Sequence, residues 1–587
     1  MDEKPGPVTV EYGPTDTTSD IQPTQSNEPG IDVVVVSHKR PYGDVNFIGT
    51  YVAAGLGACS VYGAFVLPAT SLSYINTAIG PSANITGVVL AWTLCLAVGY
   101  TLVGRLSDIF GRRWFFIGAS LLATLGTIIG ATAHDVNQLI GANVLLGLGA
   151  AVQLSFNYIL PELVPMKDRF YVVSLIFIFA LPLSGFGPVI GRLLIVHTTA
   201  GWRWFYYINI ILNGLSSLLY FLFYFPPAFG KLHRNRSLWQ EIKDLDFGGI
   251  ILYSGGFLVL CMGLSWGGVV YPWGSAHVIA TLVAGAVTVV IFVLYEIYMP
   301  LNRPLVPMHL FKSRDYCVLT VISAVGGMLY YSLNVIYPTM IAALFTTDPV
   351  RGGLLACAIG GGVAAGQFSS SLWAKPGGQF RWKLFFSVVA CTAFTAAMAG
   401  VKYNEHAASA LMVLASFFIG ALESLVGIAI TFCIKDQSEI GVAVGVYGSV
   451  RSAAGCLATS LFATILMNRV THNIEHTVVP ALVEAGLPVA SVKPFLTALE
   501  SGNKSAIAQV PGVTTSVIGV AVETTKWSYS NAFSLVFLVT LAFGICSCIV
   551  AFFSAEVEKY YTDDVVRQLD RGFFGKHRAA SEDTDKI

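Results

Sequence analysis

Charged side chains are scarce in this 587-residue sequence. Asp, Glu, Lys and Arg make up 12% of it and hydrophobic residues 55%, whereas soluble domains carry about 25% charged residues. Lys and Arg together number 34, as do Asp and Glu, so the formal net charge is zero and gives no argument for binding nucleic acid. With a mean hydropathy of +0.67, the composition predicts an all-α polytopic membrane protein embedded in a lipid bilayer.

Motifs that identify enzymes and metal proteins are also missing. The ten cysteines lie in or at the ends of apolar runs, and none has metal-ligand spacing within a polar loop. The sequence has no nucleotide-binding loop of the Walker type and no nucleophile elbow. We therefore expect no enzyme activity, no metal and no cofactor. Without an ATPase, any transport by the chain must draw on an ion gradient, which we take to be one of protons.

Long apolar runs fill most of the chain between residues 47 and 553. A membrane-spanning helix needs about 20 apolar residues, and fourteen runs are long enough to be one. They are 47–69, 85–106, 114–133, 138–160, 170–196, 204–226, 246–266, 275–296, 317–345, 351–373, 383–400, 407–432, 438–468 and 529–553.

Positive charges fall on alternate connections between these runs. An even number of spans places both ends of the chain on one side, and positive charge marks the cytosolic side. With a cytosolic N-terminus, the short outside loops carry only Arg203, Arg351 and Lys402. The inside loops carry Arg105, Arg112, Arg113, Lys167, Arg169, Lys231, Arg234, Arg236, Lys243, Arg303, Lys312, Arg314, Lys375, Arg381, Lys383 and Lys435. The charges therefore support fourteen spans independently of hydropathy.

The connection between the second and third runs reads Gly-Arg-Leu-Ser-Asp-Ile-Phe-Gly-Arg-Arg over residues 104–113. We predict a short cytosolic turn, in which Gly104 and Gly111 permit close approach and Asp108 pairs with a cation or caps a helix. Arg112 and Arg113 mark the cytosolic face. The stretch could be an ordinary positive loop. It also resembles the loop 2–3 signature of the major facilitator superfamily, Gly-x-Leu-x-Asp-x-x-Gly-Arg-Arg.

That resemblance implies two six-helix bundles that rock about a central site. Residues 374–383 resemble a worn copy of the 104–113 stretch without its Asp, which indicates an internal repeat. We expect Asp108 to help close the cytosolic gate. The implied parts are a disordered cytosolic tail (1–44, without a signal-peptide pattern), an N-terminal bundle (45–226), a linker (227–245), two inserted spans (246–316), a C-terminal bundle (317–555) with an extracellular loop (469–528), and a cytosolic tail (556–587).

Span 5 contains a proline and several glycines, which kink a helix and permit close packing. Gly187, Pro188 and Gly191 fit the antiporter signature of exporters in the superfamily, Gly-x-x-x-Gly-Pro-x-x-Gly-Gly. Leu183 and Arg192 replace its first and last glycines. The pattern favours export, and its alternative is general helix packing.

Two charges lie deep inside apolar runs, where ionised groups are costly and often functional. Glu423 in span 12 suits a proton carrier, because a low-dielectric environment favours a neutral carboxyl group. Arg451 in span 13 is either its static partner or a substrate group. In span 4, Asn143 stands where many proton-coupled members of the superfamily have an arginine.

Polar and aromatic side chains on other spans offer a mixed lining for a cavity. Gln153 and Trp92 belong to this set, together with Asn157, Asn209, Asn213, Asn334, Gln367, Tyr330, Tyr331 and Tyr447. Such a lining suits a bulky, uncharged, oxygenated ligand, although each amide alone could serve a helix–helix hydrogen bond. Two glycosylation sequons lie outside, at Asn503 and at Asn84, the latter close to the membrane.

Several strings in order, Leu139–Gly147, Ser155-Phe156, Pro161–Arg169 and Gly201–Asn209, resemble the fungal trichothecene efflux pump family. That family implies proton-driven export of a toxin or drug-like small molecule by a monomer. The alternative is uptake of siderophore-bound iron, since siderophore transporters share fourteen spans and a long last outside loop. We expect the plasma membrane as location, with a vacuolar or vesicle membrane as the alternative.

Overall fold

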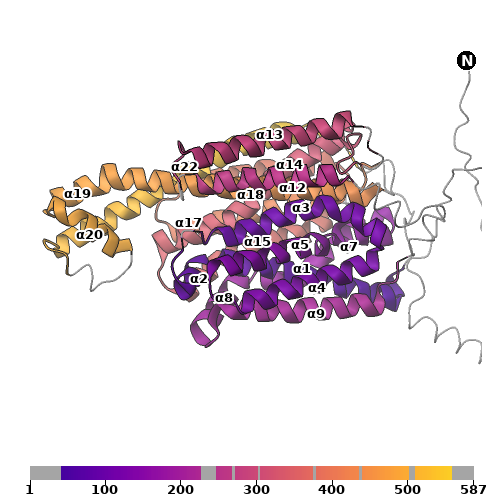
Figure 1. Cartoon of the computed structure of the whole chain (residues 1–587), viewed down its shortest axis with the longest axis horizontal. Helices are drawn as coiled ribbons and strands as arrows, with labels where there is room; N and C mark the ends of the chain where they lie inside the picture. The colour runs from indigo at the N-terminus through magenta and orange to yellow at the C-terminus, as the bar shows by residue number, and fades with distance from the viewer. Residues whose placement is uncertain are drawn as a thin grey trace, which may run out of the picture. The chain divides into compact units, whose positions relative to one another are not determined.

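Long helices that lie side by side make up the body of the molecule (Figure 1). A computed structural model describes residues 41–82, 84–226, 246–267, 271–299, 301, 304–374, 378–434, 439–500, 509–554 and 556–557. These residues contain fourteen helical segments long and apolar enough to cross a membrane, which confirms the predicted number. Apart from one isolated bridge between Gly267 and Tyr271, they form no β-structure.

The first six spans form the N-terminal helix set (residues 45–223), in which spans 4 and 5 are each broken in two. Its helices are α1 (Val45–Ala69), α2 (Leu72–Ile79), α3 (Gly87–Phe110), α4 (Arg112–Ala131), α5 (Val136–Gln153), α6 (Phe156–Leu163), α7 (Arg169–Ser184), α8 (Gly187–His197) and α9 (Trp204–Phe223). Spans 7 and 8 are α12 (Phe247–Trp266) and α13 (Ala276–Tyr298).

The last six spans form the C-terminal helix set (residues 314–551). Its helices are α14 (Arg314–Met340), α15 (Pro349–Ala374), α16 (Phe380–Ala397), α17 (Glu405–Ala429), α18 (Ile440–Asn473), α19 (Val479–Glu484), α20 (Val489–Glu500) and α22 (Thr515–Ala551). Polar caps fix several helix starts. Asp44, Asp135 and Asn404 accept hydrogen bonds from backbone N–H groups at the starts of α1, α5 and α17.

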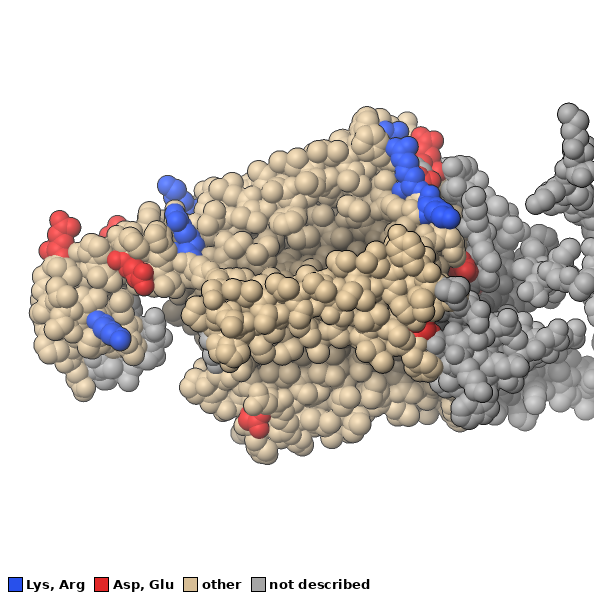
Figure 2. Space-filling view, turned by 45° about the horizontal axis from the view of Figure 1, so that its top comes forward, with Lys and Arg blue, Asp and Glu red and all other residues tan. Residues whose placement is uncertain are grey.

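α12 and α13 are the least enclosed spans. The buried share of the most apolar stretch is 28% in α12 and 17% in α13, whereas it is 83% in α1. α12 packs on α13 and also contacts α3 and α18. This peripheral position fits two spans inserted between two bundles. On the face shown in Figure 2, charged side chains gather toward the two ends and leave an uncharged band between them, as a bilayer requires.

The 104–113 stretch is mostly helical, unlike the turn predicted for it. α3 continues to Phe110, and α4 begins at Arg112. Only Gly111 lies between them, with a φ of 81° that a residue without a Cβ adopts readily. The glycines and charges of this stretch favour a turn in the sequence. The packing of α3 along α18 stabilises the helix instead.

The outside segment 469–528 is also largely helical rather than a loop. α18 runs on to Asn473 and leads through a π-helical turn (Ile474–Val478) into α19, and α22 already begins at Thr515. These helices project beyond the bundle (Figure 1) and bury a small apolar cluster of their own. Its members are Val478, Leu482, Leu487, Val492, Phe495, Val517 and Ala521.

Candidate transport pathway

A buried ion pair lies on the C-terminal helix set. Arg451 of α18 donates from Nη2 to Glu423 Oε1 of α17 at 2.5 Å and from Nε to the same oxygen at 3.0 Å. Arg451 Nη1 donates to the Tyr331 hydroxyl at 3.0 Å, and Gln367 Nε2 lies 3.5 Å from Glu423 Oε2. The Glu423 side chain is 4% exposed. The two charges that the sequence singled out therefore contact each other.

This pair borders a small central cavity of about 40 Å³ between the two helix sets. The N-terminal set contributes Tyr62, Tyr100, Asn157 and Phe177, among others, and the C-terminal set adds Gln367, Ser424 and Tyr447. The space is enough for water and far too small for a drug-sized molecule. Of the predicted lining residues, only Asn157, Gln367 and Tyr447 border this cavity, and in this conformation it encloses no substrate-sized site.

The chemistry of the pair suits proton coupling. Two buried charges are tolerated because each satisfies the other, and loss of one charge leaves an expensive uncompensated partner. A proton on Glu423 would remove the charge that holds Arg451, so protonation and side-chain position are linked. Among the described residues no three His, Cys, Asp or Glu side chains group as metal ligands.

At the end of the bundle that the positive charges predict to be cytosolic, the two helix sets are in direct contact. Arg169, fully buried at the start of α7, donates to the Thr431 hydroxyl and carbonyl at 3.2 and 3.3 Å. Phe170 stacks on Phe432 with ring centroids 5.7 Å apart. A Cβ on Gly104 would lie 2.6 Å from the Gly441 carbonyl oxygen of α18. The cytosolic end of the pathway is therefore closed.

The arginines of the 104–113 stretch bind within the N-terminal set. Arg112 is 4% exposed, forms an ion pair with Glu162 of α6 and lies over the Tyr158 ring. Arg113 donates to the Phe221 carbonyl at 2.6 Å. The side chain of Asp108 lies outside the described residues, so its predicted pairing across the bundles stays a prediction.

Four aromatic side chains lie above the ion pair toward the outside. Phe65 of α1 packs on Trp92 of α3 at 4.9 Å and on Tyr331 and Tyr330 of α14 at 5.3 and 6.1 Å between ring centroids. Tyr331 also accepts the hydrogen bond from Arg451. This aromatic layer joins the two helix sets. Trp92 Nε1 is buried there without a hydrogen-bond partner.

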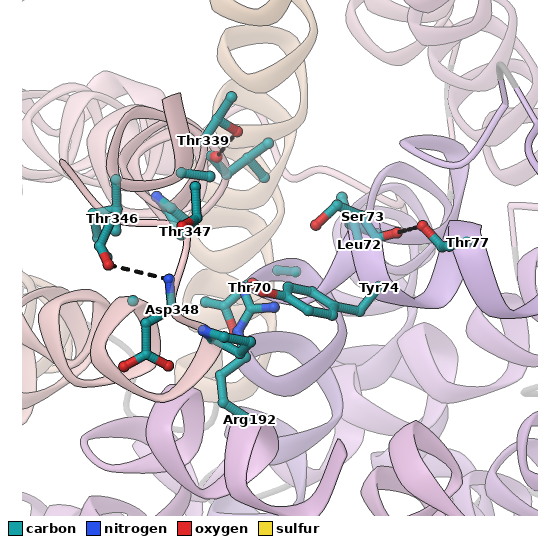
Figure 3. Close-up of a pocket in the computed structure, with 17 residues that line it drawn as sticks. Thr70, Leu72, Ser73, Tyr74, Thr77, Arg192, Thr339, Thr346, Thr347 and Asp348 are labelled. Atoms are coloured by element: carbon teal, nitrogen blue, oxygen red, sulfur yellow. Dashed lines mark hydrogen bonds between the residues drawn. The ribbon is translucent and has the colours of Figure 1, made fainter. Parts of the chain in front are cut away.

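Beyond this layer lies a larger cavity of about 430 Å³, here called the outer vestibule. Its walls come from the outer ends of α1, α2 and α8 on one side and of α14 and α15 on the other (Figure 3). Threonines, Arg192 and Asp348 share the lining with apolar side chains. With the orientation predicted from the charges, a closed cytosolic end and a cavity between the opposite helix ends correspond to an outward-directed conformation.

Gly187 and Gly191 of span 5 face α1 and α9 within the N-terminal helix set, and Pro188 lies next to α15. α8 begins at Gly187, with Pro188 in its first turn. A Cβ on Gly353 of α15 would lie 3.0 Å from the Pro188 carbonyl oxygen, and one on Gly191 would lie 3.2 Å from Phe205. The glycines of the motif therefore permit close packing inside the N-terminal set, and its proline lies in the contact between α8 and α15.

Asn143 and Gln153 lie apart from both cavities. Asn143 donates to the Leu139 carbonyl of its own helix at 2.9 Å. Gln153 donates to Asn213 Oδ1 at 2.7 Å and joins α5 to α9. Asn84 is exposed just before α3, whereas Asn503 lies outside the described residues.

Three contacts of buried charged residues do not follow from the sequence. Glu162 lies in a family-like string that does not mark its pairing with Arg112, and Arg169 counts there only as a loop charge. Arg192 stands there only as a departure from the span 5 motif. Each is a charged residue within or beside an apolar run, a signal that could have marked all three.

The model of a family described as fungal trichothecene efflux pump matches residues 38–583. The trichothecene efflux pump TRI12 of Fusarium sporotrichioides is 30% identical over 90% of this chain and 89% of its own length. The pump of the same name from Trichoderma arundinaceum is 29% identical over the same shares. Among solved structures, a D-xylose–proton symporter aligns with a TM-score of 0.53 at 12% identity over 87% of this chain and 99% of its own.

Proposed function

This chain belongs to the fungal trichothecene efflux pump family, and we propose that it exports a trichothecene-like molecule by proton antiport. It has the major facilitator fold and exports a toxin or drug-like secondary metabolite, as the names of its relatives indicate. The proposal concerns the coupling and the residues that carry it. Its main support is the Glu423–Arg451 pair, buried at the central cavity between a closed cytosolic end and the outer vestibule.

The proposed cycle alternates two states of Glu423. In the outward-directed conformation a proton from outside neutralises Glu423 and releases Arg451. The helix sets then rock apart at the cytosolic end, where Arg169 and Gly104 now form contacts. The proton leaves to the cytosol, the toxin enters, and the re-formed pair favours return to the outward conformation.

We place the protein as a monomer in the plasma membrane. Both the central cavity and the outer vestibule lie between the two helix sets of one chain, which supports transport by a single copy. Export from the cell requires passage across the plasma membrane. The inward, siderophore-transporting alternative has no supporting contact among the described residues.

The test is accumulation of a tritium-labelled trichothecene in cells with and without the chain, at two external pH values. We expect lower accumulation with the chain, a larger difference at the acidic external pH, and loss of the difference on addition of a proton uncoupler. Raised accumulation with the chain would refute export, and export that the uncoupler does not change would refute proton coupling.

A further inference from the structure

Arg192 of α8 is a buried cation whose hydrogen bonds are only partly satisfied. It is 8% exposed and donates from Nη2 to the Thr70 carbonyl at 2.6 Å. Its guanidinium lies 3.9 Å from the centroid of the Tyr74 ring. Nε and Nη1 are buried without a partner. Because an unmade hydrogen bond of a buried charged donor is costly, these two nitrogens indicate a ligand that the described residues do not supply.

Arg192 lies in the wall of the outer vestibule, and an acidic residue shares that wall. Figure 3 shows Arg192 rising toward Thr70 and Tyr74, with Asp348 on its other side. The described ion pairs do not join Arg192 to Asp348. Asp348 Oδ1 accepts only from its neighbour Val350 N–H, at 3.1 Å. The wall of the vestibule thus carries a guanidinium with two unpartnered nitrogens and a carboxylate, without a net charge.

The rest of the lining is apolar or carries hydroxyl groups. Leu72, Val335, Pro338 and Ile341 supply apolar contact, and Thr339 lies among them. The volume of about 430 Å³ falls within the range of small-molecule sites. A neutral, largely apolar molecule with both carbonyl and hydroxyl oxygens matches this combination. An anion would meet the carboxylate of Asp348, and a cation the guanidinium of Arg192.

We propose that the outer vestibule is an exit site that holds the exported molecule after it has passed the aromatic layer. Arg192 donates to a carbonyl oxygen of the molecule, and Asp348 accepts from one of its hydroxyl groups. The inference rests on the proposed function for the identity of the ligand. The central cavity of about 40 Å³ cannot hold the molecule in this conformation, so the vestibule is the larger compartment on the pathway.

The test is equilibrium binding of a tritium-labelled, acetylated trichothecene to the purified full-length chain in lipid nanodiscs. Arg192→Gln keeps a polar, uncharged side chain and removes the guanidinium with its two unpartnered nitrogens. We expect it to weaken binding about tenfold, the usual effect of losing a charged hydrogen-bond donor. The matched control is Arg203→Gln, because Arg203 also donates to a backbone carbonyl (Ala133) and lies over an aromatic ring (Trp202) away from the vestibule.

A second variant, Asp348→Asn, changes an exposed residue and keeps the test valid if Arg192→Gln fails to fold. We expect it to weaken binding of the hydroxylated trichothecene but not of its deoxy analogue. Wild-type affinity in both variants would overturn the exit site.

The binding assay also separates the exit site from the proton coupling, because binding needs no proton gradient. If binding depends on Arg192 but export does not respond to the uncoupler, only the proposed coupling is contradicted. If export responds to the uncoupler but binding does not depend on Arg192, only the exit site is contradicted.

Discussion

At the scale of single residues, Glu423 is the group on which the proposed coupling depends. Glu423→Gln is nearly isosteric but cannot take up or release a proton, so we expect loss of uncoupler-sensitive export with normal amounts of protein in the membrane. The measurement is labelled trichothecene efflux from cells matched for protein level. Efflux at the wild-type rate would contradict the assignment.

Glu405→Gln is the matched control for that variant. Glu405 lies on the same helix and also binds an arginine, with Arg351 Nη2 at 2.8 and 2.9 Å from its two oxygens. Arg351 is 57% exposed, and an exposed ion pair contributes little to stability. We expect efflux of Glu405→Gln to match the wild type.

Arg112 and Glu162 test the cost of an unpaired buried charge. Arg112→Met leaves Glu162 buried beside an apolar side chain, and we expect a loss of about 3 kcal/mol in unfolding free energy. The double variant Arg112→Met, Glu162→Met should recover part of it, because it removes both charges of this ion pair together. Thermal unfolding of the purified variants measures both, and equal stability of the single and double variants would refute the pairing.

The sequence singles out the buried charged residues and offers the pairing of Arg451 with Glu423 as one of two roles for Arg451. Glu423 and Arg451 stand out because each is charged within an apolar run, and their contact depends on how α17 and α18 both pack on α14. Gln153 and Asn143 carry the same polar signal, yet their bonds stay within the N-terminal set. Hydropathy does not distinguish a pathway side chain from a helix–helix hydrogen bond.

At the scale of helices, the contact of α3 with α18 closes the cytosolic end. Gly104→Ala would place its Cβ 2.6 Å from the Gly441 carbonyl oxygen, whereas a Cβ on Gly118 meets nothing within 4 Å. We expect Gly104→Ala to lower the efflux rate several-fold with little loss of protein, since only the closed state is obstructed. Gly118→Ala should leave efflux unchanged, and similar rates for both variants would contradict the role of this contact.

Helix ends were the least predictable part of the fold. Glycines and charges over 104–113 favour a turn, yet packing on α18 keeps α3 helical up to Phe110. The polar composition of 469–528 favours a loop. Its apolar residues recur closely enough to form the small cluster around Leu482 and Phe495, and this tertiary burial stabilises helices that the composition alone does not predict.

At the scale of the whole molecule, the number of spans and the fold class followed from the sequence because both depend on bulk properties. Apolar length sets the spans, and the distribution of Lys and Arg sets their direction. The sequence does not predict the conformational state. Closure of the cytosolic end depends on contacts between residues far apart in the chain, such as Arg169 with Thr431.

Alternating access predicts that locking the cytosolic end stops transport. The Ser174 and Ser424 hydroxyl oxygens lie 3.4 Å apart across the two helix sets, a separation that a disulfide between cysteines can bridge. Oxidation of the double variant Ser174→Cys, Ser424→Cys should abolish efflux, and a reductant should restore it. The single variants, with the native cysteines still present, should not respond. Efflux by the cross-linked chain would refute the rocking of the two sets.

The central claim is that a proton gradient drives export through Glu423, and reconstituted vesicles test it most directly. The chain is inserted with its outer face toward the lumen, and the lumen is made acidic relative to the bath. A neutral trichothecene does not redistribute passively with pH. The account predicts its accumulation in the lumen with the wild-type chain, and no accumulation with Glu423→Gln or without the pH difference. Equal accumulation with and without the gradient would contradict it.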